Sequence, residues 1–134
     1  MKNKEIEKLT EFIGYFENED NSFYRHSREE TEEEELERML LISYDTEVME
    51  FVRKFWESDI SMDYCMDYLD QHMGNYGYSF QTAVEQGDYE LLRAVLTYLI
   101  RQERFRSGVW ATAIDERLFL TILKRLEDMK EGGH

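Results

Sequence analysis

Four aspartates in the middle of the chain have the spacing of side chains on one face of a helix. Asp59, Asp63, Asp67 and Asp70 follow one another at intervals of four, four and three residues. In a helix, these intervals place neighbouring carboxylates roughly 6 Å apart. That separation is close to the spacing of phosphates along a nucleic-acid strand. Three interpretations of this stripe follow. It could be a solvated surface without a partner, a surface that binds a basic protein, or a mimic of the phosphates of DNA.

A second acidic group lies earlier in the chain. Residues 29–37 contain seven glutamates, four of them consecutive: Glu32, Glu33, Glu34 and Glu35. Thr31 and Glu34 have the spacing of a capping box, which predicts a helix over residues 32–42 with acids in its first turn. Because like charges repel and attract water, we expect residues 29–37 to be a solvated, partly ordered, mobile segment.

Arg101, Glu103, Arg104 and Trp110 could form a polar patch at the end of a predicted helix. By helical angle, Glu103 falls toward the apolar side of that helix, between Leu96 and Leu99. A carboxylate removed from water needs a partner, or its pKa rises. We therefore expect Glu103 to be partly buried and paired with Arg125; the alternative is a helix that ends at Gln102 and leaves Glu103 in water.

The same patch permits other chemistry. Arg101 and Arg104, with Arg93 and Arg106, could bind an anion or an acidic peptide through their guanidinium groups. They could equally hold the chain's own residues 29–37 or the aspartate stripe, or join two copies in a homodimer. Acid–base catalysis by Glu103 with Tyr98 is a further alternative.

Other site chemistry has little support in the sequence. The residues that metals prefer are limited to Cys65, His26, His72 and His134, apart from the carboxylates, and no calcium-loop or Glu-x-x-His pattern is present. Cys65 lies on an apolar helix side, so we expect an inert core thiol. No nucleophile elbow, phosphate loop or dinucleotide fingerprint occurs. We expect no metal and no cofactor, and we favour a non-enzymatic role over an enzymatic one.

The composition indicates a single acidic domain over residues 1–134. Hydrophobic residues make up 42% of the chain, there is no proline, and one cysteine is present. A chain of this length buries about two-thirds of its extended surface, which suffices for a core without disulfides. The sequence shows no leader peptide and no apolar run long enough to cross a membrane. We expect a cytoplasmic protein that does not bind membranes.

The net charge of −14 is distributed unevenly. Residues 1–67 hold 20 acidic and 8 basic side chains, whereas residues 68–134 hold 10 and 8. DNA and anionic membranes bind proteins through lysine and arginine. We therefore expect no direct binding of nucleic acid, and we favour a basic protein as the partner.

Hydrophobic periodicity predicts an all-α, compact single-domain bundle of about six or seven helices. The expected helices cover residues 4–16, 46–56, 59–73, 79–85, 91–105 and a last helix capped by Asp115. The central helix has leucines on one face and arginines with Thr97 on the other, and Gly108 is its expected stop. Residues 76–78 could hold a short strand. Residues 130–134 are expected to be a disordered tail.

The expected buried residues follow from the same periodicity. In the helix over 46–56 the core face is Val48, Met49, Phe51, Val52, Phe55 and Trp56. In the helix over 59–73 the side opposite the aspartates carries Met62, Tyr64, Cys65, Met66, Tyr68 and Leu69.

The last third of the chain contains a Leu-Thr-Tyr, Arg-x-Glu-Arg-Phe, Gly-x-Trp and Ile-Leu-x-Arg-Leu pattern, formed by Leu96, Thr97, Tyr98, Arg101, Glu103, Arg104, Phe105, Gly108, Trp110, Ile122, Leu123, Arg125 and Leu126. In this pattern the chain resembles a family of small bacterial proteins of unknown function. The resemblance implies a bacterial cytosolic protein and brings no activity or substrate. Members often have a glycine before the last helix, where this chain has Arg117, so we expect that corner to differ.

These observations favour a non-enzymatic interaction or regulatory protein. Its acidic residues would bind a basic partner. The alternative is a ligand-binding or enzymatic pocket around Arg101, Glu103, Arg104 and Trp110, which requires a concave, partly dry site beside them.

Overall fold

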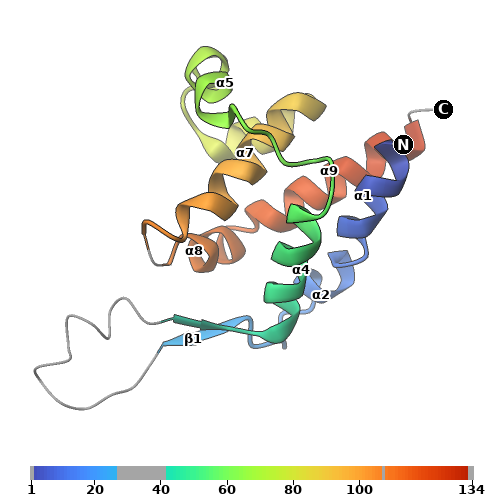
Figure 1. Ribbon diagram of the computed structural model, residues 1–134, viewed down its shortest axis with the longest axis vertical. Helices are drawn as coiled ribbons and strands as arrows, with labels where there is room; N and C mark the ends of the chain where they lie inside the picture. Colours follow the sequence, from blue (N-terminus) through green and yellow to red (C-terminus); the bar gives the residue numbers. More distant parts are fainter. Residues whose placement is uncertain (1, 27–41, 107, 133–134) are drawn as a thin grey trace, which may run out of the picture.

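The computed structural model describes residues 2–26, 42–106 and 108–132 (Figure 1). The helices are α1 (Lys2–Thr10), α2 (Ile13–Glu17), α4 (Thr46–Trp56), α5 (Cys65–His72), the 3₁₀ helix η2 (Met73–Tyr76), α6 (Phe80–Gln86), α7 (Tyr89–Gln102), α8 (Val109–Asp115) and α9 (Leu118–Gly132). The strands are β1 (Tyr24–His26) and β2 (Ile42–Tyr44). The predicted all-α class is confirmed. No described helix is both long and apolar enough to cross a lipid bilayer.

Helix α7 lies at the centre of the bundle (Figure 1). It packs against α5, α6, α8 and α9. Its leucines are buried, as expected, but so is Thr97 on the predicted polar face, with only 1% of its surface exposed. The segment that connects α4 to α5 packs against the predicted polar face of α7. The central helix is therefore covered on both sides.

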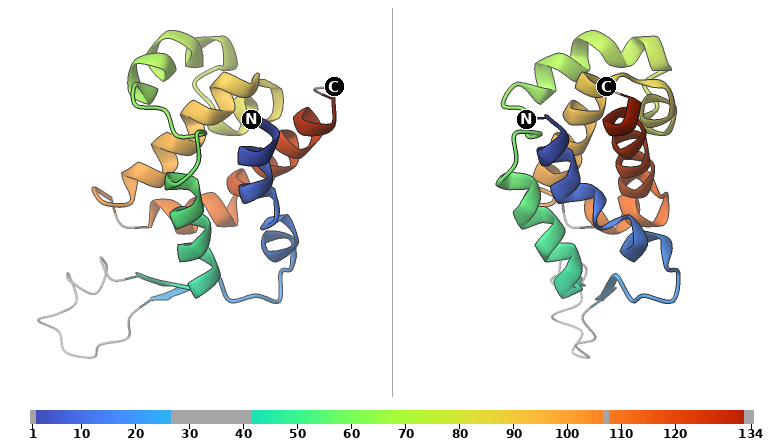
Figure 2. Two further views of the ribbon diagram at one scale, coloured as in Figure 1. Left: turned by 45° about the vertical axis from the view of Figure 1, so that its right-hand side comes forward. Right: turned by 90° about the vertical axis from the view of Figure 1, so that its right-hand side faces the viewer.

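Helix α9 organises the other half of the molecule. Helices α1, α2 and α6 pack along it, so the first and last described helices lie side by side (Figure 2). Phe51 of α4 joins this half, with ring centroids 5.6 Å from Phe12, 5.2 Å from Phe16 and 5.3 Å from Phe119. This aromatic cluster fixes α4 against the two N-terminal helices.

Side chains cap the first turn of three of the described helices. Asp45 accepts a hydrogen bond from the N–H of Thr46 before α4, Ser79 from Thr82 at α6, and Asp88 from Leu91 at α7. The helix predicted over residues 4–16 is divided between α1 and α2. Ile6, Leu9, Phe12 and Phe16 of this segment are buried, and Ile13 is partly buried.

The prediction of strands was wrong in position. Residues 73–76 form η2, and the left-handed Gly77 follows with φ 65°. The one sheet in the described part of the chain is the antiparallel pair β1–β2, with Tyr24 opposite Tyr44. This pair extends from the lower end of the helices in Figure 1. The predicted helix over 32–42 lies mostly outside the described residues, but Ile42 belongs to β2.

The predictions for the end of the chain also need correction. Asp115 is the last residue of α8 and does not cap α9. Arg117 has φ 62°, the left-handed conformation that glycine favours, so the arginine takes the backbone shape that a glycine would supply. Helix α9 continues to Gly132, so the expected tail from residue 130 begins within a helix.

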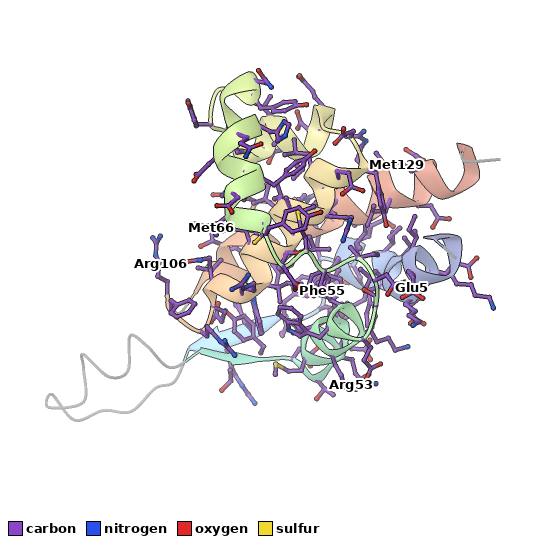
Figure 3. The ribbon with its side chains drawn as sticks, turned by 45° about the horizontal axis from the view of Figure 1, so that its top comes forward. Glu5, Arg53, Phe55, Met66, Arg106 and Met129 are labelled. Carbon is purple, nitrogen blue, oxygen red and sulfur yellow. The ribbon has the colours of Figure 1, made fainter. Side chains whose placement is uncertain are left out.

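Helix α4 shows which predicted core residues were misplaced. Phe55 points into the bundle, whereas Arg53 on the same helix points outward (Figure 3). Met49 and Trp56, expected in the core, are 50% and 48% exposed. Trp56 therefore presents half of a large aromatic surface to solvent, and it borders the candidate site described next.

Candidate functional site

Glu103 accepts hydrogen bonds at both carboxylate oxygens. Its Oε1 accepts from the N–H of Trp110 at 2.9 Å, and its Oε2 accepts from the N–H of Gly108 at 3.1 Å and from the hydroxyl of Tyr44 at 2.9 Å. Helix α7 ends at Gln102, yet Glu103 is only partly exposed, because it turns toward the first residues of α8. The carboxylate therefore satisfies backbone donors that α8 itself leaves unpaired.

Tyr44 connects the small sheet to this cap. Its hydroxyl donates to Glu103 and accepts from the N–H of Ala111 at 3.3 Å, and its ring centroid lies 5.0 Å from that of Trp110. Burial, and then the hydrogen bond to Glu103, raises the pKa of Tyr44 well above its usual range. The strand β2 is thereby attached to the start of α8.

The expected pair of Glu103 and Arg125 does not form. Both are described residues, and Arg125 instead donates to the carbonyls of Val84 at 3.0 Å and Gly87 at 2.8 Å. These carbonyls lie at the end of α6, where the helix leaves its last acceptors without partners. Arg125 is thus a structural cation that joins α9 to α6. The expectation that Glu103 is partly buried holds, but its partner was predicted wrongly.

A cleft of about 510 Å³ lies beside Glu103, and we call it the tryptophan cleft. Its lining comes from α4, the end of α7, the following turn and α8: Val52, Trp56, Ile100, Arg101, Glu103, Arg104 and Trp110. The chain has two tryptophans, and both border this space. The four residues of the predicted patch are brought together here. Val52, Trp56 and Ile100 were missed because their sequence pattern is that of ordinary core residues.

The arginines of the predicted group separate into two kinds. Arg93 donates to Ile60 O at 2.9 Å, Ser61 O at 2.8 Å and Asp59 O at 3.3 Å, and it pairs with Glu90. Arg101 and Arg104 are exposed and have no carboxylate partner among the described residues. The closest polar contact of Arg101 is the Cys65 sulfur at 3.9 Å. Residues 29–37, the other expected partner, lie outside the described residues.

The contacts of Arg93 shorten the predicted aspartate helix. Thr97 accepts from the N–H of Met62 at 3.1 Å, so residues 59–62 are held to α7 in a non-helical conformation. Helix α5 begins at Cys65, and Asp59 and Asp63 precede it. The prediction that all four aspartates lie on one helix was therefore wrong. The DNA-mimic interpretation depends on the regular spacing of such a helix, so it loses its basis. Asp67 and Asp70 remain on the helix.

The exposed side of this segment mixes acids with apolar groups. We call Asp63, Tyr64, Met66, Asp67 and Asp70 the α5 acidic face; all five are exposed. Tyr64 and Met66, which the sequence places on the side opposite the aspartates, are 59% and 50% exposed. Cys65 is buried between them, as expected, and burial raises the pKa of its thiol.

Several acidic residues elsewhere in the described chain pair with its own cations. Glu11 pairs with Lys54, Glu17 with Lys124, and Glu19 with Arg117. By contrast, Asp63, Asp67 and Asp70 form no ion pair and no side-chain hydrogen bond within the described residues. The α5 acidic face is thus negative charge that the described part of the protein leaves uncompensated.

Two other kinds of chemistry, acid–base catalysis with Tyr98 and metal binding, have no supporting arrangement of side chains in the described residues. Tyr98 packs against Phe80, with ring centroids 5.4 Å apart, and does not border the tryptophan cleft with Glu103. Glu103 has three donors on its two oxygens, which weakens its case as a general base. No three histidine, cysteine or carboxylate side chains among the described residues are placed to hold a metal.

The comparisons with known proteins place the chain in a family without giving it an activity. Neither the curated proteins nor the solved structures contain a significant match. One family model, described as a family of unknown function (DUF6508), matches residues 1–132. Since that match covers nearly the whole chain, the protein belongs to the DUF6508 family of unknown function.

Proposed function

We propose that the protein is a non-enzymatic interaction or regulatory protein that binds a basic partner protein through the α5 acidic face. The observation that carries this proposal is that Asp63, Asp67 and Asp70, next in the chain to exposed Tyr64 and Met66, have no ion-pair partner among the described residues. Tyrosine and methionine are enriched at protein interfaces, where their apolar area is removed from water. The acids supply complementarity to lysine and arginine.

The whole-chain charge supports the same class of partner. A net charge of −14 attracts a basic protein over a distance of about 10 Å at moderate salt and repels nucleic acids. Charges at an exposed rim mainly affect the association rate and its salt dependence. Tyr64 and Met66 would therefore provide affinity by burial, while the three aspartates would select the partner by charge.

The test is affinity capture from nuclease-treated bacterial lysate at low and high salt. The variant Asp63→Asn/Asp67→Asn/Asp70→Asn is compared with Glu47→Gln/Glu116→Gln/Asp128→Asn, which removes three exposed acids elsewhere. At low salt, we expect the wild type and the Glu47/Glu116/Asp128 variant to capture a basic protein. The Asp63/Asp67/Asp70 variant should not capture it. Equal loss with both variants would show a general charge effect and would contradict a specific α5 acidic face.

A further inference from the structure

The tryptophan cleft has the size and the apolar lining of a small-molecule site. Its volume of about 510 Å³ lies within the range of roughly 300–1,000 Å³ that ligand pockets occupy. Val52, Ile100 and Trp110 are 7%, 3% and 8% exposed, and they give the cleft a fixed apolar base. The indole of Trp110 is anchored by a hydrogen bond from its Nε1 to the carbonyl of Ile100 at 3.1 Å.

Trp56 forms one wall of the cleft, and part of its indole ring is exposed to solvent. Its side chain is 48% exposed, and its ring contacts Phe55 at a centroid distance of 5.0 Å. Its indole N–H has no hydrogen-bond acceptor within the described part of the protein. A planar ring that stacks on Trp56 would cover apolar surface that now faces water, and its substituents could accept from the free indole N–H.

The charges at the cleft favour an anion. The Glu103 carboxylate accepts from the Trp110 and Gly108 N–H groups and from the Tyr44 hydroxyl, and among the described residues it forms no ion pair with Arg101 or Arg104. Arg101 and Arg104 border the same space without a carboxylate partner among the described residues. Two guanidinium groups without a carboxylate partner among the described residues are suited to a carboxylate or phosphate, which they can bind bidentately.

We propose that the tryptophan cleft binds a small aromatic anion. Its planar ring lies against Trp56 over the base of Val52, Ile100 and Trp110. Its carboxylate or phosphate lies at Arg101 and Arg104. This site goes beyond the binding of a basic protein at the α5 acidic face, since it uses other residues and the opposite charge. A nucleic-acid polymer does not fit, because its many phosphates would meet the net charge of −14.

The test is a titration followed by ¹H–¹⁵N nuclear magnetic resonance of the whole chain. The two tryptophans give two indole N–H signals, both from residues that line the cleft, and Trp56→Phe assigns them. Adenosine monophosphate and indole-3-acetate are the anionic probes. Adenosine and indole-3-acetamide are their uncharged counterparts, and inorganic phosphate is the anion without a ring.

We expect the Trp56 indole signal to shift saturably with one anionic probe and to shift much less with its uncharged counterpart. Whether the phosphate or the carboxylate probe succeeds identifies the anionic group. The variant Arg101→Met/Arg104→Met should weaken binding by about tenfold or more. Arg106→Met should not, because Arg106 is exposed on the same turn but does not line the cleft.

Three results would overturn the proposal. The first is that neither anionic probe gives a saturable shift. The second is equal binding of the charged and uncharged members of a pair, and the third is unchanged affinity in the double arginine variant. Because the α5 aspartates are intact in every sample, none of these results bears on the binding of a basic protein.

Discussion

The Oε1 atom of Glu103 accepts a hydrogen bond from the backbone N–H of Trp110 at 2.9 Å. This contact closes the turn between α7 and α8 and places Glu103 beside the tryptophan cleft. Glu103 therefore positions Trp110, and among the described residues it forms no ion pair with Arg101 or Arg104, which line the same cleft. A residue that resembled a buried ion-pair partner in the sequence is a helix cap in the structure.

Removal of the Glu103 carboxylate should destabilise the protein. We expect Glu103→Ala to lower the free energy of unfolding by about 2 kcal/mol, because two backbone donors and the Tyr44 hydroxyl lose their acceptor. Glu103→Gln should cost less, since it retains one acceptor oxygen. Urea denaturation measures both.

The same experiment extends to Arg125 as a double-mutant cycle. Because Arg125 binds the carbonyls of Val84 and Gly87, the effects of Glu103→Gln and Arg125→Met should add within about 0.5 kcal/mol. A coupling free energy well above that value would show that the two side chains do interact.

Tyr44 should make stability sensitive to alkaline pH. The folded state raises the pKa of Tyr44, so it holds the phenolic proton more tightly than the unfolded state. The resulting stabilisation is complete below the unfolded pKa of about 10 and is lost as the pH rises beyond it.

Tyr44→Phe should therefore be less stable than the wild type at neutral pH, with a shallower loss of stability above about pH 10. The slopes should differ by no more than about 1.4 kcal/mol per pH unit. Urea denaturation at several pH values measures them, and Tyr78→Phe, at a 78% exposed position, is the matched control. Parallel slopes in Tyr44→Phe and wild type would contradict the assigned environment of Tyr44.

Replacement of Arg117 by glycine should stabilise the protein. Arg117 has φ 62°. For a residue with a Cβ atom, this left-handed conformation costs about 1 kcal/mol or more of free energy. Its exposed ion pair with Glu19 contributes little. Arg117→Gly should raise the melting temperature, whereas Arg117→Ala, which keeps the Cβ atom, should not. Equal stabilisation by both changes would mean that backbone strain is not the cause.

Thr97 should control the connection that precedes α5. Its hydroxyl accepts from the Met62 N–H at 3.1 Å and donates to the carbonyl of Arg93 at 2.8 Å. Thr97→Val has a similar shape without the hydroxyl, so we expect a loss of about 1–3 kcal/mol. Thr97→Ser retains the hydroxyl and should keep the Met62 amide protected from hydrogen exchange. Equally fast exchange in both variants would contradict this role.

Local signals in the sequence predicted several helix positions. The helices expected over 46–56, 79–85 and 91–105 are present as α4, α6 and α7, where Asp45, Ser79 and Asp88 cap the first turns. The cap expected at Asp115 was wrong, although the expected last helix is present as α9, with Leu118, Phe119, Ile122, Leu123 and Leu126 all buried.

Contacts between distant residues account for the errors. The aspartate spacing predicts a helix from residue 59, but Arg93 and Thr97 bind the backbone of residues 59–62 from more than 30 positions away. Tyr44 lies 59 residues before Glu103, so no local pattern could reveal their contact. The candidate patch could be predicted only in part, because Val52 and Trp56 reach it through the packing of α4.

The most direct test of binding at the α5 acidic face is the salt dependence of affinity for the purified basic partner. Isothermal titration calorimetry at several ionic strengths should give a dissociation constant that rises with salt for the wild type. The variant Asp63→Asn/Asp67→Asn/Asp70→Asn should bind more weakly and with a clearly shallower salt dependence than the variant altered at Glu47, Glu116 and Asp128. Identical affinities and slopes for the two variants would contradict the proposed binding surface.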